Sequence, residues 1–137
     1  MKAIAYCVIS VVMLCPMYSY STELLNAIAC IESNCDDAAV GDGGEAVGRY
    51  QIHKIYVDDV NRIAGTSYSY DDRYDPVKSK QMVIIYLTHY GDFYTRVTGK
   101  TPTAEVLARI HNGGPYGYRK KETTKYWNKV KKRIRDD

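Results

Sequence analysis

The chain has 137 residues, of which 45% are hydrophobic and 26% charged, so it is expected to fold as one compact domain and not to be intrinsically disordered. The net charge of +3 hides an asymmetry, because residues 119–137 hold nine of the 19 Lys and Arg against three acids. This segment predicts a cationic helix face, which either keeps the protein soluble or attracts anionic partners such as wall polymers, nucleic acid or lipid.

Residues 1–21 are typical of an export signal. Lys2 is followed by an apolar stretch from Ala3 to Pro16 and then by a polar sequence that ends at Thr22. The apolar run is too short to span a bilayer comfortably. We therefore expect a secreted or periplasmic protein with a mature domain at residues 22–137, and an uncleaved N-terminal anchor is the alternative.

Two of the four cysteines fall inside that leader, so the mature domain keeps Cys30 and Cys35. In an oxidising compartment this pair can form a small-loop disulfide, and two buried free thiols are the alternative. The three histidines show no metal-ligand spacing, so no metal site is expected.

The apolar positions predict a mainly α-helical α+β domain. Thr22 is expected to cap a first helix that ends near Ser33, and Asp75-Pro76 and Thr101-Pro102 each combine an N-cap with proline at the first helical position. The glycine-rich segment 39–52 predicts a short β-hairpin with a turn at Asp42–Gly44. Further helices are expected at residues 54–64, 75–90, 102–111 and 119–135, with Gly65, Gly91 and Gly99 between them.

Glu32 is the first candidate catalytic residue. It ends an apolar helix, where its carboxyl group is poorly hydrated. Poor hydration favours the protonated form and suits the group to donate a proton near neutral pH. Taken alone, a Glu at a helix end is more often a solvent-exposed charge.

The surroundings of Glu32 resemble a known pattern. Glu32-Ser33, a glycine-rich turn and then Gly48-Arg49-Tyr50-Gln51 are similar to the core of the lysozyme-like superfamily, notably to its SLT-type lytic transglycosylases. The resemblance implies a lysozyme-like fold with Glu32 as the catalytic acid. It also implies that Ser33, Tyr50 and Gln51 contribute to the sugar-binding cleft.

A second resemblance covers the C-terminal half. His111-Asn112-Gly113-Gly114-Pro115, followed by Tyr126-Trp127-Asn128, is similar to invertebrate-type (i-type) lysozymes. In that family a second carboxylate lies in the β-region, and the position nearest to it here is Asp42, with Glu45 as the other candidate. His111, Asn112 and Tyr126 are further expected substrate-binding residues, although a structural role for His111 in the turn is equally compatible with the sequence. The dense cysteines of that family are absent.

Together the two resemblances imply a peptidoglycan-cleaving glycosidase that acts on the β-1,4 bond between N-acetylmuramic acid and N-acetylglucosamine. A hydrolase needs a second carboxylate, whereas a lytic transglycosylase needs only Glu32. The alternatives are a non-catalytic wall-binding module that uses the basic C-terminal helix, and a peptidase that would pair Ser33 with His111. We expect a monomer that requires no cofactor and binds no nucleic acid.

Overall fold

The computed structural model describes residues 21–136. The expected signal segment lies outside this range, apart from Ser21 at its edge. The described chain is mainly helical, with one small antiparallel sheet. None of the helices in residues 21–136 combines the length and the apolar character that crossing a bilayer requires.

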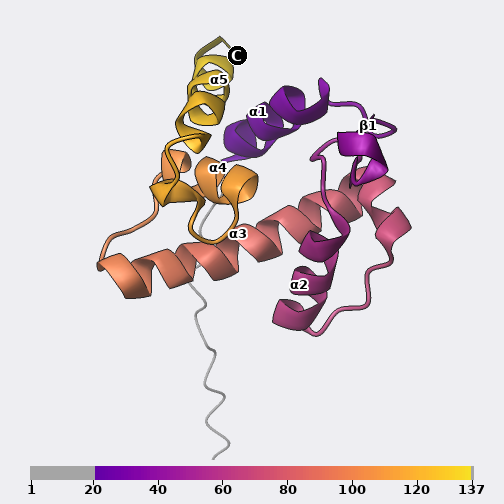
Figure 1. Ribbon diagram of the computed structural model, residues 1–137, viewed down its shortest axis with the longest axis horizontal. Coiled ribbons are helices and arrows are strands. Elements are labelled where there is room, and N and C mark those ends of the chain that lie inside the picture. The colour runs from indigo at the N-terminus through magenta and orange to yellow at the C-terminus, as the bar shows by residue number, and fades with distance from the viewer. Residues whose placement is uncertain (1–20, 137) are drawn as a thin grey trace, which may run out of the picture.

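Five α-helices form the body of the domain (Figure 1). Helix α3 crosses the molecule and packs against α2 on one side and α4 on another, while α1, α4 and α5 pack on one another. The core lies between them and is built from aliphatic side chains of every helix, including Ile28, Val57, Leu87, Ile110 and Val130. The helices are α1 (Thr22–Ser33), α2 (Lys54–Ala64), α3 (Pro76–Thr98), α4 (Ala104–Gly113) and α5 (Thr123–Asp136).

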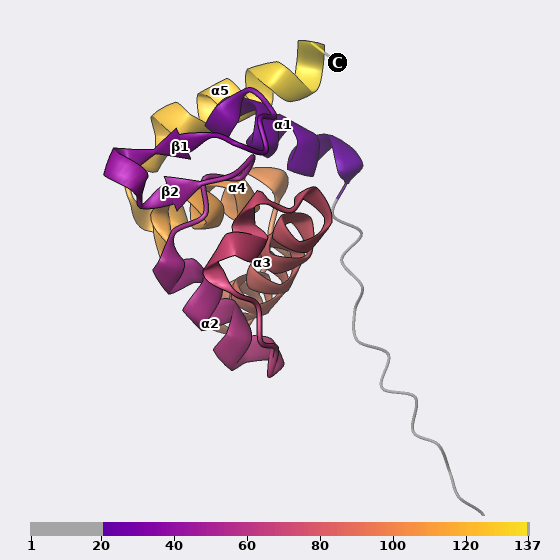
Figure 2. The ribbon, with the colours of Figure 1, turned by 90° about the vertical axis from the view of Figure 1, so that its right-hand side faces the viewer.

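The glycine-rich segment forms the expected hairpin. Strands β1 (Val40–Gly41) and β2 (Ala46–Val47) pair antiparallel, with Val40 opposite Val47, around the 3₁₀ turn η1 (Asp42–Gly44). The two strands lie side by side at one edge of the molecule (Figure 2). The hairpin follows α1 after a short connection, residues 34–39, and its turn at Asp42 is exposed.

A buried arginine fixes this hairpin to the rest of the domain. Arg73, in the 3₁₀ segment η2 (Tyr70–Tyr74), is only 4% exposed and donates from Nη1 to the carbonyl groups of Glu45 and Ile52 at 3.0 and 2.9 Å. Its Nε donates to the Tyr70 carbonyl at 2.6 Å. A buried guanidinium of this kind is stable only when its donors are satisfied. Arg73 thus ties to η2 both the residue before β2 and Ile52, which forms an isolated bridge with Val47 of β2.

Several helix boundaries differ from the sequence prediction. Ser21, not Thr22, caps α1, and Thr103, not Thr101, caps α4. The helix expected to end before Gly91 continues through this buried residue to Thr98, because packing of the surrounding turns outweighs the low helix propensity of one glycine. The last helix begins at Thr123, after a separate 3₁₀ turn, η3 (Gly117–Arg119).

The replacement Gly117→Ala is expected to lower the free energy of unfolding by about 2 to 3 kcal/mol. An added Cβ would overlap the carbonyl group of Arg109, which is part of α4 and cannot move without breaking the helix. The matched control is Gly65→Ala, where nothing lies near the added methyl group but the φ of +64° disfavours it by about 1 kcal/mol. Urea unfolding measures both variants. If Gly117→Ala and Gly65→Ala lowered the free energy of unfolding equally, the η3 turn would not be packed as described.

Candidate active site

Glu32 is placed by the last turn of α1. The helix ends at Asn34 in a left-handed conformation, with φ of 59°; the Asn34 N–H donates to the Cys30 carbonyl and the Cys35 N–H to the Ala29 carbonyl. Cys30 and Cys35 form a disulfide, which resolves the choice between paired and free thiols. The acid therefore lies within a covalently closed segment at the end of a packed helix.

Ser33 holds the neighbouring turn in place. Its hydroxyl group donates to the Arg49 carbonyl at 2.9 Å and accepts from the Asp36 N–H at 3.0 Å. Arg49 in turn pairs with Asp37, with 2.5 Å between Nε and Oδ1. The hydroxyl of Ser33 thus links α1 to the segment after the hairpin, and the structure gives it a positioning role where the sequence suggested contact with sugar.

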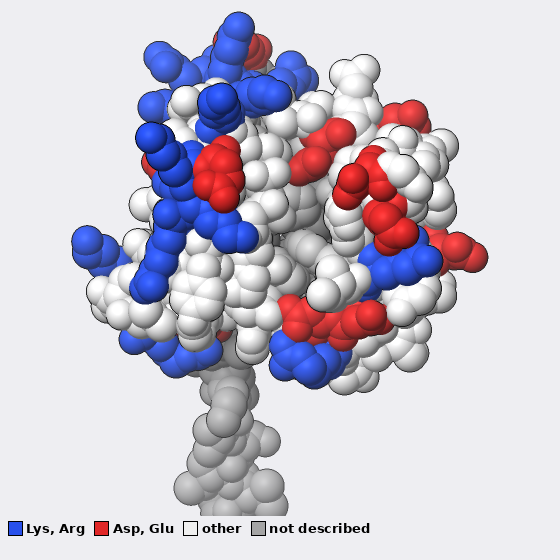
Figure 3. All heavy atoms as spheres, viewed as in Figure 1, with Lys and Arg blue, Asp and Glu red and all other residues white. Residues whose placement is uncertain are grey.

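A cavity of about 280 Å³ opens beside Glu32 and collects most of the expected site residues. The surface is hollowed between two halves of the molecule in the view of Figure 3. From the expected set, the cavity is lined by Glu32, Asp42, Gln51, His111 and Asn112. Residues far apart in the sequence therefore meet at one place, between the end of α1, the hairpin and the end of α4.

Burial makes the carboxyl group of Glu32 a weaker acid than an exposed glutamate. Its side chain is only 18% exposed, and burial raises the pKa from 4.5 to about 7. The buried phenol of Tyr126 opposes this effect only in part, because its hydroxyl lies near Glu32 but outside standard hydrogen-bond geometry. Glu32 consequently holds a proton that it can donate near neutral pH.

His111 forms the wall beside this acid and is itself uncharged. Its Nε2 lies 3.2 Å from the Tyr50 carbonyl and 3.7 Å from Oε1 of Glu32, and its Nδ1 lies 3.3 Å from the Tyr56 hydroxyl. A carbonyl can only accept, so Nε2 carries the proton and Nδ1 accepts from Tyr56. Burial lowers the pKa of His111 to about 4. No cationic imidazolium therefore favours ionisation of Glu32 at neutral pH.

The exposed carboxylate of Asp42 lines the same cavity as Glu32. Its side chain is 71% exposed, and Oδ2 lies 3.5 Å from Nε2 of His53. Asp42 and Gln51 both have φ of 48°, the left-handed region that non-glycine residues rarely adopt. Strain of this kind persists where the surrounding structure holds it, and it is concentrated at functional sites. Glu45, the other candidate carboxylate, does not line the cavity.

Three of the expected substrate-binding residues lie differently from the sequence interpretation. Tyr50 is 2% exposed and packs in the core, and its carbonyl, not its ring, faces His111. Tyr126 is buried beneath Glu32 and, like Ser33, does not line the cavity. Gln51 does line it, but its side-chain amide also donates to the Gly48 carbonyl at 3.0 Å, which holds the hairpin closed.

The sequence interpretation missed three residues of the cavity wall, namely Ala46 of β2, His53 and Tyr56. His53 precedes α2, and Tyr56 follows it by three residues, so both lie on one face of the first turn. The three-residue spacing of His53 and Tyr56, directly after Gln51, could have indicated that both side chains lie near the site. In residues 21–136 there is no group of three or more His, Cys, Asp or Glu that could hold a metal ion.

The geometry agrees with comparisons to known proteins. The Destabilase family matches residues 21–133. The chain belongs to the Destabilase family. Among its relatives, a lysozyme of Meretrix lusoria is 30% identical to this chain, and the alignment covers 82% of this chain and 88% of the relative. Invertebrate-type lysozyme 6 of Caenorhabditis elegans is 31% identical over 81% of this chain and 85% of its own length.

A solved structure supports the same assignment of fold. The crystal structure of the Meretrix lusoria lysozyme in complex with PliI of Aeromonas hydrophila superposes on this Destabilase member with a TM-score of 0.69, at 30% identity, covering 82% of this chain and 88% of the other. The lysozyme-like, mainly helical fold expected from the sequence is confirmed, and so is the i-type lysozyme part of the resemblance. The relatives support a muramidase-type glycosidase.

Raising the pH from 4.5 to 7 is expected to separate the stabilities of the parent and a Glu32→Gln variant. The folded state holds the Glu32 proton up to about pH 7, whereas the unfolded chain releases it near pH 4.5. This carboxyl group therefore stabilises the fold below pH 4.5, and the contribution, about 3 kcal/mol, is lost as the pH rises to 7.

His111 acts in the opposite sense, because its buried ring resists protonation down to about pH 4 while the unfolded chain accepts a proton near pH 6.5. The two effects nearly cancel in the parent between pH 4.5 and 6.5. The variant keeps only the His111 effect and gains stability as the pH rises through this range. Urea unfolding at several pH values measures the free energy of unfolding of both proteins. If this free energy changed with pH in the same way for the parent and the variant, the burial of Glu32 would be contradicted.

Proposed function

We propose that the protein is a lysozyme-type hydrolase that cleaves the β-1,4 bond between N-acetylmuramic acid and N-acetylglucosamine in peptidoglycan. The observation that carries the proposal is the pairing of a buried, protonated Glu32 with an exposed Asp42 in one cavity. Two carboxyl groups in contrasting environments are what acid-catalysed glycoside hydrolysis requires.

In this mechanism Glu32 donates its proton to the glycosidic oxygen as the bond breaks. Asp42 acts on the opposite side of the reacting sugar, either by attacking it or by activating water. If Asp42 attacks the sugar, Glu32 regains its proton from the water that then hydrolyses the glycosyl–Asp42 ester; if Asp42 activates water and takes its proton, Glu32 regains a proton from solvent. Burial favours this protonated state. Gln51 and Asn112 lie where they can orient hydroxyl and amide groups of the sugars.

The presence of Asp42 in the cavity favours hydrolysis over the transglycosylase reaction, which needs only one carboxyl group. The peptidase alternative has no support in the geometry, because Ser33 bonds to Arg49 and both His111 nitrogens face other partners. We also propose that the protein acts outside the cytoplasmic membrane, as the expected export signal and the Cys30–Cys35 disulfide suggest.

The cationic surface supports a role in approaching the wall. In Figure 3, Lys and Arg side chains gather over α5, while most Asp and Glu of this face lie on the other half of the molecule. Lys125, Lys129 and Lys132 recur at helical spacing and are exposed. Anionic wall polymers would be attracted to this face. A purely wall-binding module would not need the protonated acid beside it.

Mass spectrometry of digested peptidoglycan tests the reaction. Residues 22–137 and the Glu32→Gln variant are incubated with purified walls, and the released fragments are compared. Reducing-end products from the parent alone would support the hydrolase. Anhydro products, lighter by one water, would replace it with a transglycosylase, and intact glycan in both samples would favour the wall-binding alternative.

A further inference from the structure

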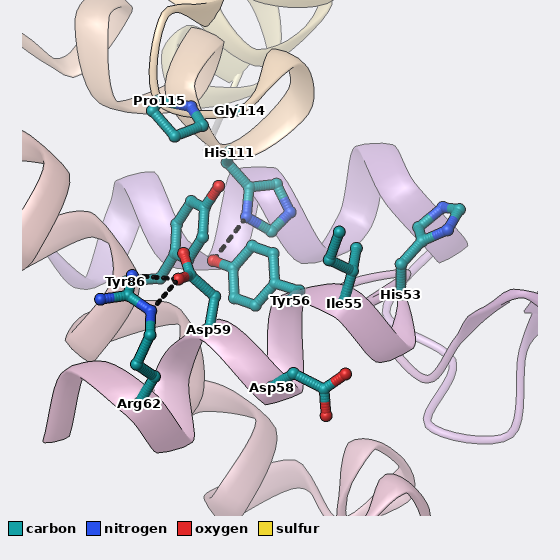
Figure 4. A pocket seen from close by; sticks show the side chains of 10 residues that line it. All are labelled: His53, Ile55, Tyr56, Asp58, Asp59, Arg62, Tyr86, His111, Gly114 and Pro115. Carbon is teal, nitrogen blue, oxygen red and sulfur yellow. Dashed lines mark hydrogen bonds and ion pairs between the residues drawn. The ribbon is translucent and has the colours of Figure 1, made fainter. Parts of the chain in front are cut away.

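A second, larger cavity adjoins the proposed active site. It has a volume of about 600 Å³ and lies between α2, α3 and the segment that follows α4 (Figure 4). His53, Tyr56 and His111 line both cavities. The two cavities therefore adjoin along these residues, and a substrate bound at Glu32 lies next to the side cavity.

The side cavity is largely apolar, unlike the polar cavity at Glu32. Ile55 is 77% exposed, and Figure 4 shows its side chain among the lining residues, beside Tyr56. Tyr86 and Pro115 form further parts of the wall. Ile55 therefore adds exposed aliphatic surface to a largely apolar cavity, which is the kind of lining that holds apolar ligand groups.

The cavity also carries a guanidinium group. Arg62 donates from Nε and Nη2 to Asp59, whose other oxygen accepts from the Tyr90 hydroxyl, and this leaves Nη1 of Arg62 available for a ligand. The Asp59 charge is thus already paired. Asp58 accepts from Tyr70 at 3.0 Å and points away from the other side chains in Figure 4. With two carboxylates against one guanidinium, the lining carries more negative than positive charge, and Nη1 of Arg62 is a hydrogen-bond donor that it offers to a ligand carbonyl.

We propose that the side cavity binds the peptide stem that branches from N-acetylmuramic acid, so that the enzyme prefers stem-bearing peptidoglycan to bare glycan. This inference rests on the proposed function. A stem combines alanine methyl groups, which suit Ile55 and Pro115, with peptide carbonyl groups, which can accept from Nη1 of Arg62. Another sugar of the glycan would bring many hydroxyl groups, and the aliphatic part of this wall offers them no hydrogen-bond partners.

The test compares two soluble substrates made from the same walls, namely glycan chains with their stems and chains from which an amidase has removed them. The parent is expected to show a kcat/KM about tenfold higher on the stem-bearing chains. Ile55→Ser and Arg62→Gln should each reduce this preference several-fold and leave cleavage of the bare chains unchanged. Val77→Ser, which alters a 64% exposed residue on α3 outside both cavities, is the matched control and should keep the parental ratio.

The outcomes separate this inference from the proposed function. Equal cleavage of both substrates by the parent would overturn the inference and leave the glycosidase intact. A parallel loss on both substrates in Ile55→Ser would show that the side cavity holds sugar, which also overturns it. If the parent cleaved neither substrate, the proposed function itself would fail, and the inference with it.

Discussion

Replacing Glu32 with glutamine is expected to lower the rate of glycan cleavage by about a thousandfold. Glutamine keeps the size of the side chain but has no proton of suitable acidity to give to the leaving oxygen. The buried environment that raises the pKa of Glu32 to about 7 offers no second acid, because His111 is neutral and bonded to Tyr50 and Tyr56. In the parent, kcat/KM should fall above about pH 7 as Glu32 loses its proton.

The matched control for this variant is Glu23→Gln. Glu23 lies in the first turn of the same helix, is exposed, and lines neither cavity. Glu23→Gln should retain the parental rate. That result would show that removing a negative charge from α1 does not by itself lower activity. Release of soluble fragments from labelled walls measures both variants. A Glu32→Gln enzyme with more than a tenth of the parental activity would exclude Glu32 as the general acid.

Replacing Asp42 with asparagine is expected to reduce hydrolysis by two to three orders of magnitude. Asparagine fits the same left-handed backbone position, since Asn and Asp tolerate positive φ better than other residues. Its amide oxygen can take the place of Oδ2, which lies 3.5 Å from Nε2 of His53. The variant therefore changes mainly the ability to attack the sugar or to activate water, and KM should change little.

Glu45→Gln provides the control for Asp42. The two acids lie three residues apart in the same hairpin, but Glu45 is exposed and its hydrogen bonds come from the backbone: its N–H donates to the Asp42 carbonyl and its carbonyl accepts from Arg73. We expect less than a twofold change in kcat for Glu45→Gln. If Asp42→Asn retained full activity and released anhydro products, the reaction would be a transglycosylation that depends on Glu32 alone.

Much of the fold follows from local sequence signals. Asp75 and Pro76 begin α3 as predicted, since the Asp75 carboxylate accepts from the N–H groups of Val77 and Lys78. Gly65 and Gly99 end α2 and α3 in the left-handed conformation that glycine favours. The continuation of α3 through Gly91 could not be predicted in the same way, because it depends on packing against other helices.

In the site, too, some residues could be predicted from local sequence, whereas the positions of others depend on tertiary packing. Glu32 is recognisable because its position at the end of an apolar helix already limits its hydration. Asp42 could be placed near it only through a resemblance, because its approach to the cavity depends on the hairpin and on the anchoring contacts of Arg73. Tyr50 was expected in the cleft because it lies beside Gln51, but its side chain turns into the core.

The Cys30–Cys35 disulfide has a consequence for how the acid is maintained. The bond closes a short ring that contains Glu32, and one of its cysteines lies on each side of the helix end. Local opening of a protein commonly starts at the ends of its helices, where backbone hydrogen bonds are fewest. Here the last turn of α1 is held covalently, so we expect Glu32 to keep its place even while more distant parts of the domain fluctuate. The position of the proposed proton donor would then depend on this local link more than on the overall stability of the fold.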